Sequence, residues 1–257
     1  VEVLYQKVIT AIHGVSFDVY PETITVLLGA NGAGKTTTLR AASGFLGSDD
    51  AAVSEGSIWL DGEAIENRQP HEMAARGIAL VPERNKVFET LTVAENLDAT
   101  GSASGTAHRR QVIERVFEYF PRLAPARNRL AGYLSGGERQ MLAMGAALAC
   151  SPRLLLVDEM SLGLAPRIVE DLMARLVMMK KDLGLTVLLV EQSAHIALEI
   201  ADYGYIMENG RIVLDGTSER LRRHKDVQEF YLGQVGGERR RSYRDVKQYH
   251  RSRRWFG

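Results

Sequence analysis

Short apolar runs alternate along the chain with longer segments in which apolar residues recur at helical spacing. Two runs, 154–157 and 186–190, are almost entirely apolar, as is typical of central strands that a parallel sheet buries on both faces. The alternation predicts an α/β fold in which helices cover a largely parallel sheet. Further strands are expected at 15–20, 23–28, 57–60, 78–81, 203–207 and 211–214, with a hairpin turn at Asn209-Gly210 between the last two.

The stretch from 93 to 133 follows a different pattern, because it is rich in helical signals. A Gly/Ser/Ala-rich loop at 101–105 is followed by apolar residues at helical spacing, namely Val112, Val116, Phe117 and Phe120. We therefore expect a helical subdomain that is inserted into the α/β core. The expected division is a core at 1–92 and 136–233, an inserted subdomain at 93–135 and a C-terminal tail at 234–257.

Composition narrows the class of protein. The 257 residues include 32 basic and 32 acidic side chains, so the formal net charge of +0 gives no reason to expect a nucleic-acid partner. A single cysteine, Cys150, excludes an internal disulfide and suits a reducing compartment. No apolar run approaches the ~18–20 residues of a membrane-spanning helix, and the N-terminus lacks a signal-peptide pattern. A role at a membrane would therefore need a partner that anchors the chain.

The tail beyond Gly236 is strongly basic, and it has two interpretations. Each Lys or Arg side chain near an anionic membrane surface adds about 1 kcal/mol of attraction, and Trp255 and Phe256 would suit the interface. Alternatively, the tail is a solvated extension that packs on partner subunits. Binding of nucleic acid by the tail is a weaker third interpretation. The basic residues are Arg239, Arg240, Arg241, Arg244, Lys247, Arg251, Arg253 and Arg254.

A phosphate-binding loop follows the apolar run 23–28. Its sequence, GANGAGKT, has the spacing GxxxxGK[ST] and stands between a strand and a helix expected to begin near Gly34, which is the context that this motif requires. The glycines let backbone N–H groups surround the phosphates, while Lys35 adds a positive charge and Thr36 offers a hydroxyl to Mg²⁺. The expected nucleotide-binding residues are Gly29, Ala30, Asn31, Gly32, Ala33, Gly34, Lys35, Thr36 and Thr37.

A second motif has the form of a Walker B strand. Four apolar residues at 154–157 lead to Asp158 and Glu159, which should lie at the carboxyl edge of the sheet. Asp158 is a candidate ligand of Mg²⁺, most simply through water. Glu159 is the candidate general base, because a carboxylate next to the metal can orient and deprotonate the attacking water.

The sequence LSGGE at 134–138 separates this chain from most phosphate-loop proteins. It precedes an expected helix at 138–150, so its N–H groups and the Ser135 hydroxyl form an anion-binding helix N-terminus. One chain cannot close this patch over its own nucleotide, because the phosphate loop already encloses that nucleotide from the other side. The residues expected to bind nucleotide here are Ser135, Gly136, Gly137 and Glu138.

Together these motifs resemble those of the ATPases of ABC transporters over nearly the whole chain, to about Gly233. The resemblance implies a P-loop NTPase (RecA-like) core with an antiparallel β segment and an inserted α-helical subdomain, and it implies ATP and Mg²⁺ as cofactors. It also implies that two subunits meet head to tail, so that each LSGGE acts on the other's ATP. Tyr5 lies where the family stacks an aromatic on adenine; packing within a small sheet is the other interpretation of this residue.

Four further segments look similar to one ATPase subunit of bacterial importers for branched-chain amino acids. They are VPERNKVFETLTVAENL at 81–97, SLGLAP at 161–166, LVEQ at 189–192 and YLG at 231–233. The subfamily also serves amides, urea and aromatic acids, so the cargo stays open. The resemblance implies transmembrane permease subunits as partners, a periplasmic substrate-binding protein as an indirect one, and a peripheral position on the cytoplasmic face of the bacterial inner membrane.

Several positions depart from the general ABC pattern. Glu83 replaces a glutamine that links the γ-phosphate and Mg²⁺ to the permease, and Gln192 replaces a histidine that contacts the γ-phosphate. Gly163 replaces an aspartate of the loop after the catalytic glutamate. The resemblance implies that the subgroup shares the first two changes. We therefore favour a heterodimer in which a different ATPase subunit contributes the standard residues, and a homodimer remains the alternative.

Two more changes look individual to this chain. Met160 replaces the proline that usually follows the catalytic glutamate, which removes a restraint on φ. Ala146 replaces an arginine of the signature helix. Neither change removes a group that hydrolysis requires, so we expect an ATPase that powers uptake of branched-chain amino acids or of a related small amino acid, amide or organic acid. The alternatives are the ATPase of an ABC exporter and a soluble, non-transport ABC ATPase.

Overall fold

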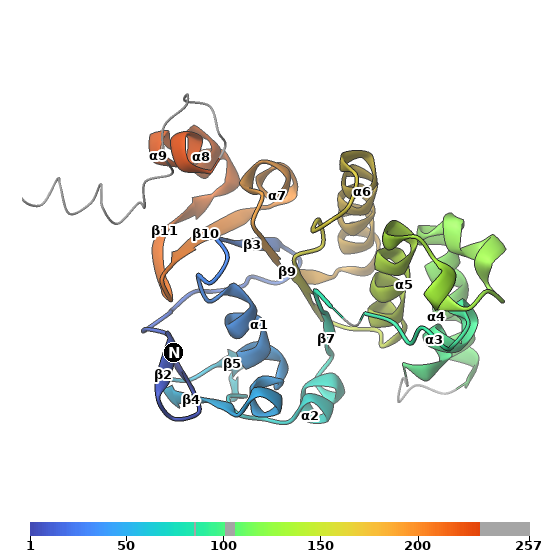
Figure 1. The fold of residues 1–257 in the computed structure, drawn as a ribbon, viewed down its shortest axis with the longest axis horizontal. Helices are drawn as coiled ribbons and strands as arrows, with labels where there is room; N and C mark the ends of the chain where they lie inside the picture. The colour runs from blue at the N-terminus through green and yellow to red at the C-terminus, as the bar shows by residue number, and fades with distance from the viewer. Residues whose placement is uncertain (85, 101–105, 232–257) are drawn as a thin grey trace, which may run out of the picture.

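The computed structural model describes residues 1–84, 86–100 and 106–231, and its centre is a six-stranded sheet (Figure 1). Five neighbouring strands are parallel, and the sixth, β11, pairs with β10 antiparallel at one edge. This arrangement confirms the predicted α/β class. The strand order is β11 (Arg211–Thr217), β10 (Tyr203–Glu208), β3 (Ile24–Leu28), β9 (Thr186–Glu191), β8 (Leu154–Asp158) and β7 (Ile78–Val81).

Helices cover both faces of this sheet, because its central strands are apolar on both sides. Ile24, Val26 and Leu28 of β3 pack in a cluster with α3 to α7, whereas Leu27 packs with α1 in a second cluster on the other face. The helices are α1 (Lys35–Ser43), α2 (Pro70–Ala75), α3 (Val93–Ala99), α4 (Thr106–Tyr119), α5 (Gly136–Ala149), α6 (Pro166–Leu183), α7 (Ala194–Ile200), α8 (Ser218–Arg223) and α9 (Lys225–Phe230). Short 3₁₀ helices lie at Leu46–Asp49, Pro121–Ala126 and Ala131–Tyr133.

The N-terminal region forms a small antiparallel sheet with the strand order β2-β1-β4. The strand expected at 15–20 is wrong, because this extended segment bonds to a chain end and a side chain rather than to a strand. Val15 exchanges backbone hydrogen bonds with Val1, and the Asp18 N–H donates to the Tyr205 hydroxyl. The expected strand 57–60 is shorter than predicted. The strands are β1 (Glu2–Tyr5), β2 (Ile9–Ile12), β4 (Ala51–Glu55), β5 (Trp59–Leu60) and β6 (Glu63–Ala64).

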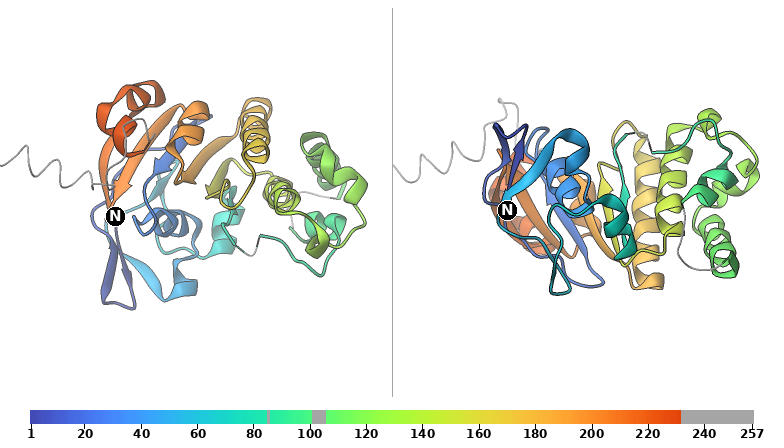
Figure 2. Two further views of the ribbon diagram at one scale, coloured as in Figure 1. Left: turned by 45° about the horizontal axis from the view of Figure 1, so that its top comes forward. Right: turned by 90° about the horizontal axis from the view of Figure 1, so that it is seen from below.

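The described residues between β7 and α5 are helical or irregular, with one isolated bridge between Thr92 and Leu130. Figures 1 and 2 show α3 and α4 at the opposite end of the molecule from the N-terminal strands. The division of the chain into a core and an inserted subdomain stays a prediction. The expected loop at 101–105 and the basic tail at 234–257 lie outside the described residues.

Two smaller predictions can be checked directly. Asn209 and Gly210 both have positive φ, 47° and 73°, so the hairpin turn between β10 and β11 is confirmed. Within the described part of the chain, no helix is both long and apolar enough to cross a membrane.

The parallel strands deliver the candidate chemistry to one edge of the sheet. Gly29 follows β3, Asp158 ends β8, and Gln192 follows β9. Glu83 comes two residues after β7. Because parallel strands share one carboxyl edge, residues from four distant segments converge there.

Candidate functional site

The phosphate loop connects the fully buried strand β3 to α1 and leaves that helix without a side-chain cap. Gly34 is the N-cap residue, and its φ of 105° is a conformation that glycine adopts without strain. The first turn of α1 contains no acidic residue. The unpaired N–H groups at this helix end are therefore available to an anion.

Lys35 is 4% exposed and folds back onto the loop. Its Nζ donates to the carbonyl oxygens of Gly29 at 2.9 Å and Ala30 at 3.2 Å, and it lies 3.1 Å from Glu159 Oε1. These three oxygens hold the ammonium group where phosphate oxygens would compete for it. The structure thus places the predicted phosphate-binding lysine and the predicted general base in direct contact.

Thr36 and Asp158 form the candidate metal pair. The Thr36 hydroxyl donates to Asp158 Oδ1 at 3.2 Å across the gap between α1 and β8. Burial raises the pKa of Asp158 to about 6, the Thr36 hydrogen bond opposes this, and the nearby Glu159 and Glu83 raise it further. A hydroxyl and a carboxylate fit Mg²⁺, which prefers oxygen ligands and usually keeps several waters. A bound cation would favour the ionised form of this carboxylate.

Glu159 has a left-handed backbone conformation, with φ of 43°. Its N–H donates to the Val190 carbonyl at 3.0 Å, which ties the end of β8 to β9. The residue is 8% exposed, so its carboxylate is largely buried. This geometry presents a carboxylate beside Lys35 and Asp158, as water activation would require.

The LSGGE motif forms the N-terminus of α5, and its own side chains cap it. Ser135 Oγ accepts from the Glu138 N–H at 3.3 Å, and Glu138 Oε2 accepts from the Ser135 N–H at 2.8 Å and hydroxyl at 2.7 Å. In the described part of the chain, no hydrogen bond or ion pair joins residues 135–138 to the phosphate loop. The motif therefore does not complete the nucleotide site of its own chain in this structure.

Comparison with known proteins decides what this arrangement is. The family model described as ABC transporter matches residues 12–161. The chain is 43% identical over 229 residues to the high-affinity branched-chain amino acid transport ATP-binding protein BraG of Pseudomonas aeruginosa, which covers 89% of this chain and 96% of that protein. This chain belongs to the ABC transporter ATP-binding family. It is accordingly an ATPase subunit. The assignment of nucleotide to its phosphate loop stays a prediction.

The chain is also similar to ATP-binding proteins of different transport systems. The probable branched-chain amino acid transport protein LivF of Archaeoglobus fulgidus is 37% identical, covering 86% of this chain and 92% of that protein. The lipopolysaccharide export protein LptB of Haemophilus influenzae is 34% identical, with coverage of 86% and 90%. Among solved structures, a nucleotide-free ATP-binding cassette from an ABC transporter has a TM-score of 0.77 at 26% identity, covering 92% of this chain and 97% of that one.

Tyr5 of this ABC ATPase lies in the small antiparallel sheet, at the end of β1. Its hydroxyl shares a hydrogen bond of 3.1 Å with Thr37 Oγ1, so the ring is fixed against the first turn of α1. This position is next to the phosphate loop, as stacking on adenine would require. The assignment of Tyr5 to adenine stays a prediction.

Glu83 and Gln192, which depart from the general ABC pattern, are more exposed than the buried Lys35, Asp158 and Glu159. Glu83 lies 3.1 Å from Arg84, and Gln192 is exposed immediately after β9. Neither residue contacts Lys35 or Asp158 through a hydrogen bond in the described residues. Both lie at the correct edge of the sheet, but their roles toward nucleotide stay predictions.

Sequence reasoning missed two polar residues that connect this edge to the helical region. Lys86 Nζ donates to Oε1 of Gln140, which is fully buried on α5 and whose Nε2 has no hydrogen-bond partner among the described residues. Burial lowers the pKa of Lys86, while Glu83, Asp158 and Glu191 oppose that shift. The loop after Glu83 is thus tied to the signature helix. No local motif marks such a pair, because its members lie 54 positions apart.

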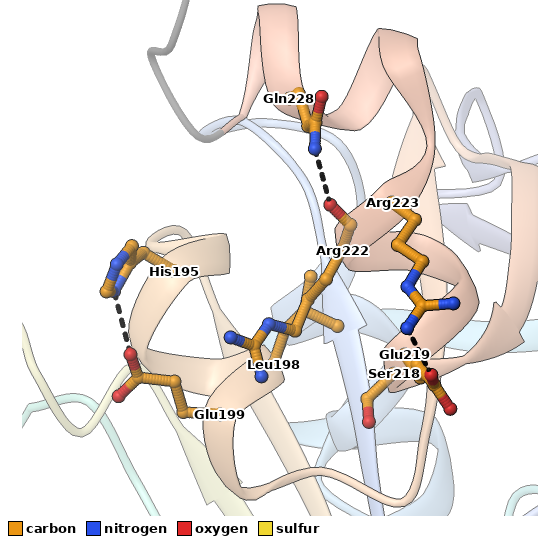
Figure 3. A pocket seen from close by; sticks show the side chains of 8 residues that line it. All are labelled: His195, Leu198, Glu199, Ser218, Glu219, Arg222, Arg223 and Gln228. Atoms are coloured by element: carbon orange, nitrogen blue, oxygen red, sulfur yellow. Dashed lines mark hydrogen bonds and ion pairs between the residues drawn. The ribbon is translucent and has the colours of Figure 1, made fainter.

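A separate polar pocket of about 530 Å³ lies between α7, α8 and α9 (Figure 3). Its charged side chains largely pair with one another: His195 lies 3.4 Å from Glu199, and Arg223 lies 2.7 Å from Glu219. Gln228 donates to the Arg222 carbonyl at 3.1 Å. None of the predicted site residues lines this pocket, so it is distinct from the nucleotide site.

Proposed function

We propose that this chain powers an importer of branched-chain amino acids or of a related small amino acid, amide or organic acid. The observation that carries the proposal is its 43% identity to BraG over 96% of that protein, compared with 34% identity to the export protein LptB. The similarity to LivF of A. fulgidus points the same way. In this proposal residues 1–92 and 136–233 form the nucleotide-binding core, and 93–135 form the inserted helical subdomain.

Hydrolysis is assigned to groups of one subunit. Lys35 would leave its three oxygen partners to bind phosphate oxygens. Thr36 and Asp158 would hold Mg²⁺, with a contribution from Glu83 through water. Mg²⁺ supplies charge neutralisation on the phosphates. Glu159 orients and deprotonates the attacking water. Gln192 donates a hydrogen bond toward the γ-phosphate but cannot supply the positive charge of a histidine.

The second half of the site is assigned to another subunit. The self-capped N-terminus of α5 supports this assignment, since no hydrogen bond or ion pair among the described residues joins residues 135–138 to their own phosphate loop. We favour a different ATPase subunit over a second copy. Glu83, Gln192 and Gly163 support this choice, as does the presence of a second relative in P. aeruginosa, BraF, at only 30% identity.

The remaining partners follow from the importer proposal. Transmembrane permease subunits would dock near residues 83–88, where Phe88 is 60% exposed and Glu83 follows β7. A periplasmic substrate-binding protein would act indirectly, through the permease. The chain would then work peripherally on the cytoplasmic face of the inner membrane. No nucleic-acid partner is proposed.

An exporter is the second candidate function, and the similarity to LptB favours it. Uptake measurements separate the two. Disruption of the gene should abolish high-affinity uptake of labelled leucine or a related solute, and the wild-type gene should restore it, whereas Glu159→Gln should not. Unchanged uptake of all such solutes would contradict the importer proposal.

Subunit composition is tested by light scattering on Glu159→Gln with and without ATP–Mg²⁺. The substitution should lower turnover by about 10²–10⁴-fold while sparing ATP binding. A persistent monomer that binds ATP would support the heterodimer. An ATP-dependent homodimer would show that one gene product completes the site, and absence of ATP binding would overturn the nucleotide-site assignment.

A further inference from the structure

One buried carboxylate beside the site has no role in the chemistry described so far. Glu191 is the last residue of β9, and it is 1% exposed. Carboxylates are almost never buried this fully without partners. Its Oε1 accepts from the Ser161 N–H at 2.9 Å, and its Oε2 accepts from the Ser161 hydroxyl at 2.6 Å. Glu191 therefore holds one residue of the loop between β8 and α6 at two points.

In the sheet, Glu191 lies at the end of β9, between β3, which leads into the phosphate loop, and β8, which ends in Asp158. It is in register with Leu28, the residue immediately before the phosphate loop. The preceding residue, Val190, is in register with Asp158 of β8. Burial raises the pKa of Glu191, and the hydrogen bonds from Ser161 oppose that shift. The carboxylate thus belongs to the same cluster of groups as the metal and base candidates.

The loop that Glu191 holds begins with a strained residue. Glu159 has φ of 43°, and a non-glycine residue in this region persists only where its surroundings enforce it. The next residue, Met160, imposes no restraint on φ, whereas a proline would. Ser161 is therefore the first point after Glu159 at which side-chain hydrogen bonds fix the loop.

We propose that Glu191 is a positioning residue for Glu159. By accepting both hydrogen bonds of Ser161, it holds the loop 159–161 so that the carboxylate of Glu159 faces the phosphate loop. It supplies the restraint that Met160 does not. This inference rests on the proposed role of Glu159 as general base.

The main test compares Glu191→Leu with Glu191→Gln. Leucine removes both acceptors, and a displacement of the base should lower kcat by about 10²-fold while KM for ATP changes little. Glutamine keeps one acceptor and can donate to the Ser161 hydroxyl, so its kcat should stay within about five-fold of wild type. A Glu191→Leu variant with kcat within about three-fold of wild type would overturn the proposal.

A rescue experiment addresses the missing proline. Met160→Pro in the Glu191→Leu background should restore kcat by about 10-fold or more, because the ring limits φ where the hydrogen bonds no longer act. The Met160 N–H makes no hydrogen bond among the described residues, so proline removes none there. No rescue together with low kcat in Glu191→Gln would show that the charge of Glu191, rather than its hold on Ser161, matters, and would overturn the proposal.

Asp202→Leu is a control for the loss of a carboxylate that accepts two hydrogen bonds away from the site. Its carboxylate accepts from the Ile24 N–H at 2.8 Å and from Lys180 at 3.2 Å, at the opposite end of the sheet. This control should lower the melting temperature without lowering kcat per folded molecule. The same result for Glu191→Leu would contradict a positioning role. If Glu191→Leu does not fold, Ser161→Ala provides the test. The proposal predicts that this variant loses about five-fold in kcat, and an unchanged kcat would contradict it.

Hydrogen exchange separates failure of this inference from failure of the base assignment. Loss of the Glu191 acceptor should speed exchange of the Ser161 amide whether or not Glu159 is the base. Full turnover by Glu159→Gln would remove the base assignment alone. Unchanged exchange at Ser161 in Glu191→Leu would remove the proposed tether.

Discussion

The helices α1 and α5 both have glycine at their N-termini, as the N-cap of α1 and as the first two residues of α5, yet their first turns are built in opposite ways. The N-cap of α1 is Gly34, which offers no side chain, and no acid stands in the first turn. The N-cap of α5 is Ser135, which forms a capping box with Glu138. The first turn of α1 has no side-chain cap, whereas in α5 the side chains of Glu138 and Ser135 accept from the N–H groups of Ser135 and Glu138.

This difference separates two ways of binding a phosphate. At α1, the proposed phosphate site combines uncapped N–H groups with Lys35, so we expect a single chain to bind nucleotide. At α5, an incoming phosphate must compete with the carboxylate of Glu138, which is favoured there by the helix dipole. The two helices also cover opposite faces of the sheet. We infer that α1 binds nucleotide first and that α5 acts only when a second subunit presents its phosphate.

The largest expected effect comes from removing the cation at α1. Lys35→Met should weaken ATP binding by about 10–100-fold, since hydrogen bonds to charged groups contribute about 1.5–3 kcal/mol. Isothermal titration with ATP–Mg²⁺ measures this, and Lys181→Met, which removes an exposed lysine of α6, is the control. Unchanged affinity in Lys35→Met would contradict the assignment of α1 as the cis phosphate site.

Alanine substitution of Gly34 before α1 and of Gly137 in the first turn of α5 should affect stability to different extents. Gly34→Ala forces a Cβ into a backbone with φ of 105° and within 2.7 Å of Met207 Cε, so it should lower the free energy of unfolding by about 1–3 kcal/mol. Gly137→Ala places its Cβ 2.8 Å from Cγ2 of the β-branched Ile168 side chain, but in a helical backbone without positive φ. Its gain in helix propensity, about 1 kcal/mol, offsets part of that clash. Urea unfolding should therefore show the smaller loss for Gly137→Ala, and the reverse order would contradict this account.

Removing the cap of α5 should affect stability and the assembled site, but not nucleotide binding to one chain. Ser135→Ala should lower the free energy of unfolding by about 1 kcal/mol and reduce turnover of the dimer, with ATP affinity of the single chain unchanged. Thr92→Ala is a matched control, because Thr92 forms the same capping box with Glu95 on α3. It should lower stability but not turnover. Equal turnover in Ser135→Ala and Thr92→Ala would contradict the proposed role of Ser135 in the partner's site.

The smallest expected effect is a pH dependence confined to α5. Hydrogen bonds from the Ser135 hydroxyl and N–H lower the pKa of Glu138, so its stabilisation is present above the usual glutamate pKa and is lost as pH falls through the lowered value. Glu138→Gln should therefore be less stable than wild type near neutral pH, and the difference should shrink in acid. Urea unfolding at several pH values measures it. A constant difference would show that the charge of Glu138 does not support the cap.

The amino-acid sequence predicted the local parts of the site well. The strand, loop and helix around Lys35 are contiguous, and the turn at Asn209-Gly210 depends on two adjacent residues, so short-range preferences suffice for both. The prediction of a strand at 15–20 was wrong because it, too, relied only on a local pattern. Its alternating pattern matched a strand, but pattern alone cannot show that its hydrogen bonds go to Val1 and the Tyr205 hydroxyl.

By itself, then, the sequence determined three local features of this protein. They are a phosphate loop that contains a lysine and a threonine, a buried strand followed by two acidic residues, and the LSGGE segment at the start of a helix. Each depends on neighbours in the chain. Only the tertiary structure decided that Lys86 contacts Gln140 and that Glu191 holds Ser161. Those pairs lie 54 and 30 positions apart, and the order of strands in the sheet, which no local pattern encodes, brings them together.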